Sequence, residues 1–185
     1  NQADLVVVTG SQNNVRAAYE SGTPAVGVGA GNVTAIVDET ADVSAAAAKI
    51  ASSKAFDHAT SCSSENSVIA DATIYDALIA AFAGEGGVLL DPDEARRLQA
   101  VMFGGGKLAP AFVAQSAGTI AARAGLDRPA IRAARFLVVA ETGVGPEHPF
   151  SGEKLSPVLA LYRADGFAAA AALAERLLHY QGAGH

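Results

Sequence analysis

The chain has 185 residues, of which 50% are hydrophobic and 17% are charged, with a net charge of −6. A chain of this length and composition can form one well-packed hydrophobic core, that is, one domain with at most part of a second, and it is not expected to be disordered. No run approaches the roughly 18 to 20 apolar residues that span a bilayer, and the basic residues are scattered singly, so neither a membrane protein nor a nucleic-acid binder is expected. A single cysteine excludes an internal disulfide and, with no charged-then-apolar leader, predicts a cytoplasmic setting.

Short apolar runs alternate with longer helical segments, which predicts an α/β fold with a largely parallel sheet. In chain order we expect a strand at 5–8, a helix at 12–20, strands at 25–28 and 35–37, a helix at 43–56, a strand at 67–70, helices at 74–82, 92–102 and 120–124, strands at 136–139 and 158–162, and a helix at 167–178. Acidic and hydroxyl residues at 38–42 are suited to capping the second helix.

Both ends of the chain indicate a fragment of a longer protein. Asn1 is not a start methionine, and the first element is a bare strand that leads into Thr9-Gly10-Ser11. The chain ends with Gly-Ala-Gly-His at residues 182–185, so its last residue is a histidine that follows a glycine. We therefore expect that the preceding part of a nucleotide-binding sheet is missing.

Cys62 is the candidate nucleophile. It lies in the segment FDHATSCSSEN, residues 56–66, where small polar residues replace the apolar neighbours usual for a core cysteine. Such neighbours let a substrate carbonyl approach, and a catalytic thiol also needs surroundings that favour its anion. The alternative is an inert, half-buried side chain.

Several separated segments resemble one family, the aldehyde dehydrogenase superfamily, and within it the acylating, coenzyme A-dependent branch. The matching segments, in the family's order, are VTGS at 8–11, GTPAVGVGAGN at 22–32, DETAD at 38–42, residues 56–68 around Cys62, and EKLSP at 153–157. The resemblance implies an α/β, aldehyde dehydrogenase-like three-layer domain with a largely parallel sheet, plus a remnant of the nucleotide-binding domain. It assigns residues 1–28 to that remnant and residues 29–185 to the catalytic, cysteine-bearing domain, truncated at both ends.

The resemblance also implies the reaction. Cys62 would add to the carbonyl of a small aldehyde, hydride would pass to NAD or NADP, and the cysteine thioester would be transferred to coenzyme A. Hydrolytic members carry a glutamate before the nucleophile, at a place that falls within residues 27–29, where this chain has Gly-Val-Gly. Without that base the thioester survives until a thiol attacks it, which favours the acylating reaction. The alternative is that the alignment is shifted, or that Glu39 or Glu65 is the base of a non-acylating enzyme.

Five residues are candidates for cofactor binding. Thr9, Gly10 and Ser11 follow a strand and open a helix, so they are expected either to face the cofactor pyrophosphate or simply to cap the helix. Gly29 belongs to the same predicted cofactor site. Glu153 matches the family glutamate that accepts hydrogen bonds from the nicotinamide-side ribose.

The histidines have separate interpretations. His185 lies where the acylating branch has a histidine in a Gly-x-Gly-His segment, and it would deprotonate the incoming thiol or assist Cys62. His58 lies four residues before Cys62, and histidines in such loops are mostly structural. Four scattered histidines and one cysteine make no zinc pattern, so no metal is predicted.

Other functions stay open at this point. A Cys/His acyltransferase or thiol hydrolase would use Cys62 with His58 or His185 and no nicotinamide, and a truncated module would retain only packing surfaces. The hydroxyl-rich surroundings of Cys62 resemble sulfoacetaldehyde-type members slightly more than acetaldehyde-type ones. The family further implies a homo-oligomer, either a dimer or a tetramer, and an oxyanion-hole side chain from the missing N-terminal part.

Overall fold

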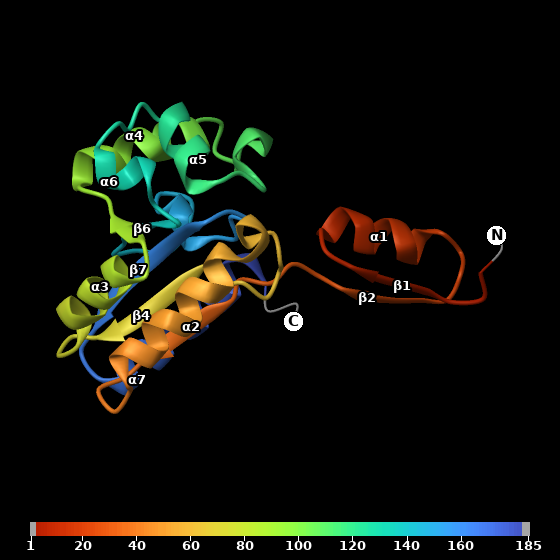
Figure 1. Ribbon diagram of the computed structural model, residues 1–185. Helices are drawn as coiled ribbons and strands as arrows, with labels where there is room; N and C mark the ends of the chain where they lie inside the picture. Colours follow the sequence, from red (N-terminus) through yellow and green to blue (C-terminus); the bar gives the residue numbers. More distant parts are fainter. Residues whose placement is uncertain (1–2, 183–185) are drawn as a thin grey trace.

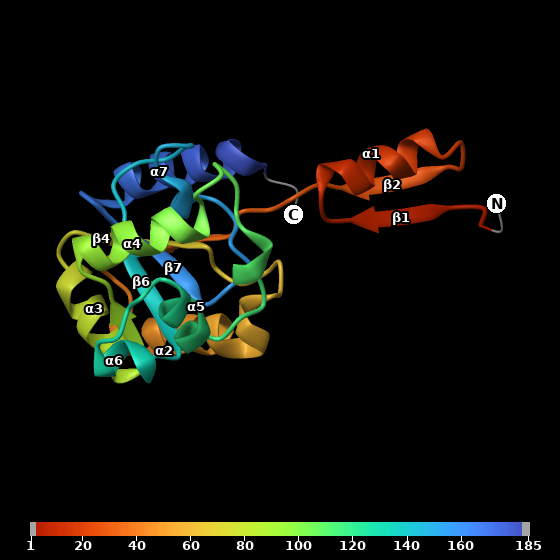
Figure 2. The ribbon, with the colours of Figure 1, turned by 90° about the horizontal axis from the view of Figure 1, so that it is seen from above.

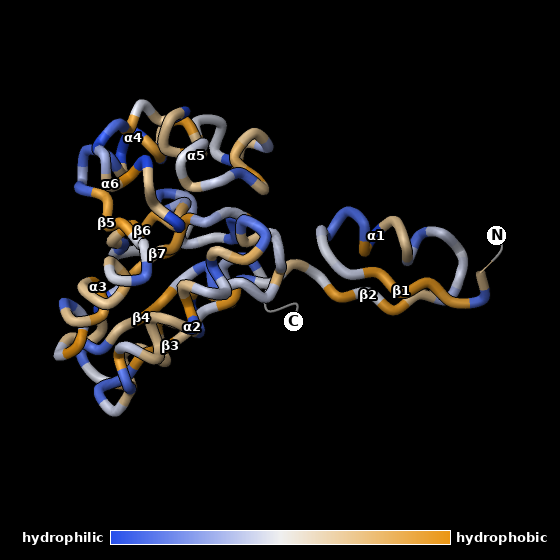
Figure 3. The backbone as a smooth tube through the Cα atoms, viewed as in Figure 1, coloured by the Kyte–Doolittle hydropathy of each residue, from blue (hydrophilic) through white to orange (hydrophobic). Residues whose placement is uncertain are grey.

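A five-stranded parallel sheet forms the main body of the protein, and a separate β–α–β unit extends from one end of it (Figure 1). The structure is a computed structural model that describes residues 3–182. The small unit consists of strand β1 (Val6–Thr9), helix α1 (Gln12–Glu20) and strand β2 (Ala25–Val28). Its two strands pair in parallel and are apolar, whereas α1 carries most of the hydrophilic residues of the unit (Figure 3).

The main sheet has the strand order β3-β4-β7-β6-β5, and every pairing is parallel. Its strands are β3 (Thr34–Val37), β4 (Ser67–Asp71), β5 (Gly87–Leu89), β6 (Phe136–Ala140) and β7 (Val158–Ala164). All five residues of β4 are buried, as expected for a central strand that helices cover on both faces.

Helices cover both faces of the sheet and make three layers (Figures 1 and 2). The helices of the main body are α2 (Val43–Ala55), α3 (Tyr75–Gly84), α4 (Pro92–Met102), α5 (Ala117–Arg123), α6 (Pro129–Arg132) and α7 (Phe167–Gln181). Helices α2 and α3 pack on one face through a cluster that includes Ile50, Leu78 and Phe82. Helices α4 to α7 pack on the other face through a second cluster, which includes Leu98 and Leu177.

The predicted α/β class with a largely parallel sheet is confirmed. The helices expected at 12–20 and 92–102 have the observed bounds, and most other elements agree within a few residues. The first strand begins and ends one residue later than expected, at Val6–Thr9. Strand β5 and the four-residue helix α6 are additional elements that the sequence pattern did not indicate.

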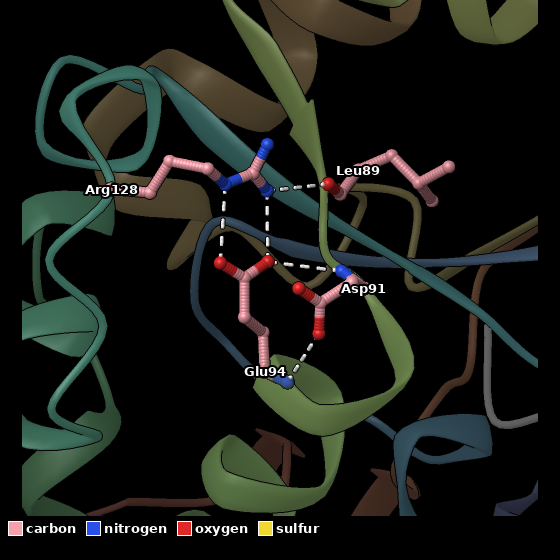
Figure 4. A network of polar contacts seen from close by, with 4 residues as sticks. All are labelled: Leu89, Asp91, Glu94 and Arg128. Carbon is pink, nitrogen blue, oxygen red and sulfur yellow. Dashed lines mark hydrogen bonds and ion pairs between the residues drawn. The ribbon is translucent and has the colours of Figure 1, made fainter.

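A polar network fixes the start of α4 against the segment that leads into α6 (Figure 4). The carboxylates of Asp91 and Glu94 each accept a backbone N–H of the other residue, at 2.8 and 2.9 Å, which is a complete capping box. Arg128 donates to both carboxylate oxygens of Glu94, at 3.1 and 2.8 Å, and to the carbonyl of Leu89 at 3.0 Å. Glu94 is 5% exposed, so its charge depends on these partners.

Replacing Glu94 by alanine is expected to lower the free energy of unfolding by about 2 kcal/mol, because it leaves Arg128 and the N–H of Asp91 without their acceptor. Asp91→Ala removes only the helix cap and is expected to cost about 1 kcal/mol. Urea unfolding followed by circular dichroism measures both. Asp93→Ala, at an exposed position of the same helix, is the control, and a loss there as large as in Glu94→Ala would contradict the assignment.

Candidate active site

Three segments that carry predicted site residues enter the main sheet at one edge. Residues 29–33 lead into β3, residues 60–66 lead into β4, and residues 152–157 lead into β7. Because these three strands are adjacent and parallel, their amino ends meet at the same edge. The segments of Gly29, Cys62 and Glu153 are therefore brought together, on the side of the sheet where β2 joins the main body (Figure 1).

Lys154 ties the cysteine segment to the Glu153 segment. Its side chain is fully buried, and its Nζ donates to the carbonyls of Asn66, Phe150 and Gly152 at 3.1, 2.6 and 2.8 Å. Its backbone N–H donates to Oδ1 of Asn66 at 3.0 Å. Three acceptors thus surround the amino group of Lys154, as a buried polar group requires.

Lys54 supports the same segment from helix α2. It is also fully buried, and its Nζ donates to the carbonyl of Glu65 at 2.8 Å. Burial lowers the pKa of Lys54 to about 7, although the charge of Glu65 opposes this shift. Burial also holds the pKa of Lys154 well below its usual value, and the charge of Lys54 adds to that effect. Two buried amino groups thus bind the backbone carbonyls of the segment that follows Cys62.

The chain reaches Cys62 through a left-handed turn. Asp57, His58 and Ala59 have φ values of 46°, 52° and 56°, although none of them is glycine. The hydroxyl of Thr60 closes the turn by donating to the carbonyl and the carboxylate of Asp57, at 2.8 and 2.7 Å. Consecutive non-glycine residues in this conformation store strain, which is typical of functional segments.

Cys62 follows this turn and is exposed. Its two neighbours are exposed as well, and the hydroxyl oxygens of Ser61 and Ser63 lie 2.8 Å apart. The thiol is therefore on the surface of a segment whose following residues, Ser64 and Asn66, are buried. This arrangement gives a reacting partner access to the sulfur while the backbone beside it is fixed.

The predicted cofactor residues Thr9, Gly10, Ser11 and Gly29 lie at the carboxyl end of the β1–α1–β2 unit. Thr9 is paired with Val28, and the N–H of Gly10 donates to the carbonyl of Val28 at 3.1 Å. The hydroxyl of Ser11 accepts the N–H of Asn14, so it caps α1. Gly10 has a φ of +121° and has no heavy atom within 4 Å of the place of a β-carbon. This end of a parallel β–α–β unit is where dinucleotides bind in such sheets.

The remaining predicted residues have different surroundings. The backbone N–H of Glu153 donates to Oε1 of Gln181 at 2.7 Å, so the end of α7 positions this residue. His58 is exposed in the left-handed turn. His185 lies outside the described residues. His148 pairs with a carboxylate, since its Nδ1 lies 2.7 Å from Oε1 of Glu141.

Asn32 is a buried residue of this edge that the sequence did not indicate. Its Nδ2 donates to the carbonyls of Ser151 and Leu177, at 2.8 and 3.0 Å, and so connects the entry of β3 to the Glu153 segment and to α7. Lys54 and Lys154 were missed as well. The sequence does contain a pattern that indicates burial of Lys54, because this residue continues the apolar stripe of α2 that Ala47, Ile50 and Ala51 form.

Within residues 3–182, no three His, Cys, Asp or Glu side chains gather in a way that would hold a metal ion. In the same part of the chain, no helix combines the length and the apolar character that crossing a membrane requires.

No family model matches the chain. Known proteins, however, are similar along its whole length. The acylating sulfoacetaldehyde dehydrogenase of Cupriavidus necator is 58% identical over 184 residues, which are 100% of this chain and 37% of that protein. The crystal structure of an acetylating aldehyde dehydrogenase from Geobacillus thermoglucosidasius has a TM-score of 0.93 and 38% identity, over 97% of this chain and 39% of the other.

A propionaldehyde dehydrogenase of Rhodopseudomonas palustris, solved with bound coenzyme A and an acylated cysteine, has a TM-score of 0.86 and 30% identity over 96% of this chain and 40% of its own. By sequence and by fold, the chain is similar to members of the aldehyde dehydrogenase superfamily. Its relatives are the coenzyme A-acylating members, so the predicted resemblance is confirmed. The chain spans about 37% of the length of its Cupriavidus relative.

Ala59→Gly is expected to raise the free energy of unfolding by up to about 1 kcal/mol, because glycine adopts a positive φ without the clash of a β-carbon. Ala59 is buried at 1% exposure, so the gain is reduced by the loss of its methyl contacts. Thermal unfolding measures the change. Ala51→Gly, in the interior of α2, is the matched control and is expected to destabilise; a similar loss at Ala59 would show that the turn is not strained.

The lowered pKa of Lys54 predicts a dependence of stability on pH. Between about pH 7 and its unfolded value of 10.5, the unfolded chain binds more protons than the folded chain, so stability rises with pH by up to about 1.4 kcal/mol per unit. From pH 7 to pH 9 the wild-type chain is expected to gain about 2 kcal/mol relative to Lys54→Met. Urea unfolding at both pH values measures this difference. Lys107→Met, at an exposed lysine, is expected to behave as wild type. If the unfolding free energy depends equally on pH in all three proteins, the lowered pKa of Lys54 is refuted.

Proposed function

We propose that this chain provides the catalytic cysteine of an acylating aldehyde dehydrogenase, which oxidises a small aldehyde with NAD or NADP and transfers the acyl group to coenzyme A. The observation that carries the proposal is the exposed Cys62 beside a backbone fixed by two buried lysines, in a fold whose propionaldehyde dehydrogenase neighbour has an acylated cysteine. A cytoplasmic location and a homo-oligomeric state belong to the same proposal.

The assignment of the two parts of the chain is also proposed. Residues 1–28 would belong to the nucleotide-binding domain and residues 29–185 to the catalytic domain. The described residues fit a dinucleotide at the carboxyl end of β1 and β2, because the backbone of Gly10 is open there and α1 begins beside it. Thr9, Gly10 and Ser11 would hold the pyrophosphate, and the carboxylate of Glu153 would accept hydrogen bonds from ribose hydroxyls.

The chemistry of the chain's own residues follows from this placement. When bound, the nicotinamide supplies the hydride acceptor. Cys62 forms a bond from Sγ to the aldehyde carbon, retains the acyl group as a thioester after hydride has left, and is released as a thiolate when that group passes to the thiol of coenzyme A. Lys54 and Lys154 act by holding the segment of Cys62. His185 remains a proposed base for the incoming thiol.

Packing at the glycine segment supports acyl transfer over hydrolysis. A β-carbon at Gly27 would lie 2.6 Å from Cγ1 of Val15, and one at Gly29 would lie 2.4 Å from Nε2 of Gln12. Val15 therefore occupies the space that a larger side chain at position 27 would need, whereas at position 29 the end of the Gln12 side chain would have to move. A thioester on Cys62 has no water-activating base in this segment and persists until a thiol takes the acyl group.

The reaction is tested with the enzyme expressed from the complete reading frame. NADH or NADPH formation from sulfoacetaldehyde and from propionaldehyde is expected to depend on coenzyme A, and the acyl-coenzyme A product is identified by mass spectrometry. Cys62→Ala is expected to lower kcat at least about a thousandfold, whereas Ser44→Ala, at an exposed serine of α2, leaves it unchanged. Rapid release of free acid without coenzyme A would refute acyl transfer, and activity without nicotinamide would favour an acyltransferase.

A further inference from the structure

Three separate parts of the chain hold the short segment that begins at Glu153. The backbone N–H of Glu153 donates to Oε1 of Gln181, at the end of α7, at 2.7 Å. The next residue, Lys154, is buried and donates to three backbone carbonyls. The carbonyl of Leu155 accepts the N–H of Ala114, in the connection between α4 and α5, at 3.0 Å. Each residue of this clamped segment, residues 153–155, is thus fixed by a different partner.

Backbone strain marks the last of these contacts. Leu155 and Ala114 have φ values of 43° and 57°, although neither is glycine. The left-handed conformation costs free energy for a residue with a β-carbon, and it persists only where the surrounding structure imposes it. Here two such residues from distant parts of the sequence are joined by one hydrogen bond. Strain of this kind gathers at segments whose placement matters for function.

Two amide side chains tie the end of α7 to the chain just before Glu153. A β-carbon at Gly152 would lie 2.5 Å from Nε2 of Gln181, so a larger residue at position 152 would displace this amide. Nδ2 of Asn32, a residue that is 1% exposed, donates to the carbonyls of Ser151 and Leu177 at 2.8 and 3.0 Å. The last turn of α7 is therefore joined to this part of the chain at two points.

The end of α7 also lies against the linker that leaves the small unit. A β-carbon at Gly182 would lie 2.9 Å from the carbonyl oxygen of Ala30, and Ala30 directly follows the proposed cofactor residue Gly29. Gln181 is the residue before Gly182. The side chain that holds the backbone of Glu153 therefore comes from a turn next to the proposed cofactor unit.

Preorganisation explains what this arrangement would do. A carboxylate that accepts hydrogen bonds from ribose hydroxyls binds well only if its backbone already has the bound position, because ordering the chain on binding costs free energy. Groups that contact a ligand need to lie within about 0.5 Å of their productive positions. The contacts to Gln181, Lys154 and Ala114 fix the backbone from which the side chain of Glu153 extends.

We propose that Gln181 and Leu155 are positioning residues that hold Glu153 ready for the nicotinamide-side ribose of NAD or NADP. Gln181 acts through the N–H of Glu153, and Leu155 acts through its strained contact with Ala114. The inference rests on the proposed function and concerns the cofactor alone. It gives neither residue a part in binding the aldehyde.

The test uses the complete enzyme and the cofactor that it accepts. Gln181→Met keeps the length of the side chain and removes the acceptor, so it is expected to raise KM for the cofactor about fivefold to tenfold, with kcat changed less than about twofold. Isothermal titration calorimetry with the cofactor alone is expected to give the same increase in Kd. Gln181→Glu keeps an acceptor oxygen at the same reach and is expected to restore both values to within about twofold. Glu175→Met, at an exposed position of the same helix, is the control and is expected to behave as wild type.

Leu155→Gly tests the strained contact separately. Glycine adopts a positive φ without the clash of a β-carbon and is also free to leave it, so the fold is kept while the constraint is relaxed. This variant is expected to raise the Kd for the cofactor about threefold, and urea unfolding checks that it is folded. An unchanged Kd in the folded variant would remove Leu155 from the proposal.

The outcomes separate this inference from the function on which it rests. An unchanged Kd for the cofactor in Gln181→Met would overturn the inference. An equal rise of KM for the aldehyde would overturn it as well, because it would indicate a general distortion of the site. Coenzyme A-dependent aldehyde oxidation by the wild type, with an unaltered Gln181→Met variant, would refute the inference and keep the proposed function. No coenzyme A-dependent oxidation of any aldehyde would refute the proposed function and the inference with it.

Discussion

The amino group of Lys154 lies where two of the three entering segments meet, and it donates to the carbonyls of Asn66 and Gly152 in these segments and to that of Phe150 nearby. Removing an amino group from water costs free energy unless its donors are satisfied, so the carbonyls of Asn66, Phe150 and Gly152 must keep their positions for the side chain to remain buried. The cysteine segment and the Glu153 segment are thus fixed relative to each other by one group. Asn66 strengthens this link, because its side chain accepts the backbone N–H of Lys154.

The segments that Lys154 joins lie at the amino ends of strands of the main sheet. In open parallel sheets ligands usually bind beyond the carboxyl ends of the strands, and Thr9, Gly10 and Gly29, the proposed cofactor residues, lie at that end of the β1–α1–β2 unit. The main sheet instead offers the segments that precede β3, β4 and β7. The linker at residues 29–33 leads from the carboxyl end of β2 to the amino end of β3, so the proposed cofactor residues and Cys62 lie at opposite ends of the strands of their two sheets.

Local patterns in the sequence predicted what depends on local physics. The apolar stripe and the Asp42 cap of α2, and the capping box of α4, determine those helices almost without tertiary help. Strand β5 was missed because three residues beginning with glycine carry no strand period, and it forms only by pairing with β6. The left-handed turn at 57–59 could not be predicted, since no glycine marks it. The part of the site built by Lys154 and Asn66 joins residues 88 positions apart, and no pattern in a single sequence reports such a contact.

The sheet topology also indicates which carboxylates lie too far from Cys62 to activate a water molecule at a thioester there. Glu39 follows β3, so it lies at the carboxyl edge of the sheet, whereas Cys62 precedes the adjacent β4 at the amino edge. A strand of this length separates the two edges by about 10 Å, which is too far for a base that must reach a water at the thioester. Glu65 is nearer, but Oε2 of Glu65 is buried and the carbonyl of the same residue is held by Lys54. Neither Glu39 nor Glu65 is therefore placed to activate water, and residues 27–29 contain no carboxylate. In the proposed reaction the acyl group on Cys62 would therefore wait for an external nucleophile, and a thiol would suit that role because it attacks a thioester without a strong base.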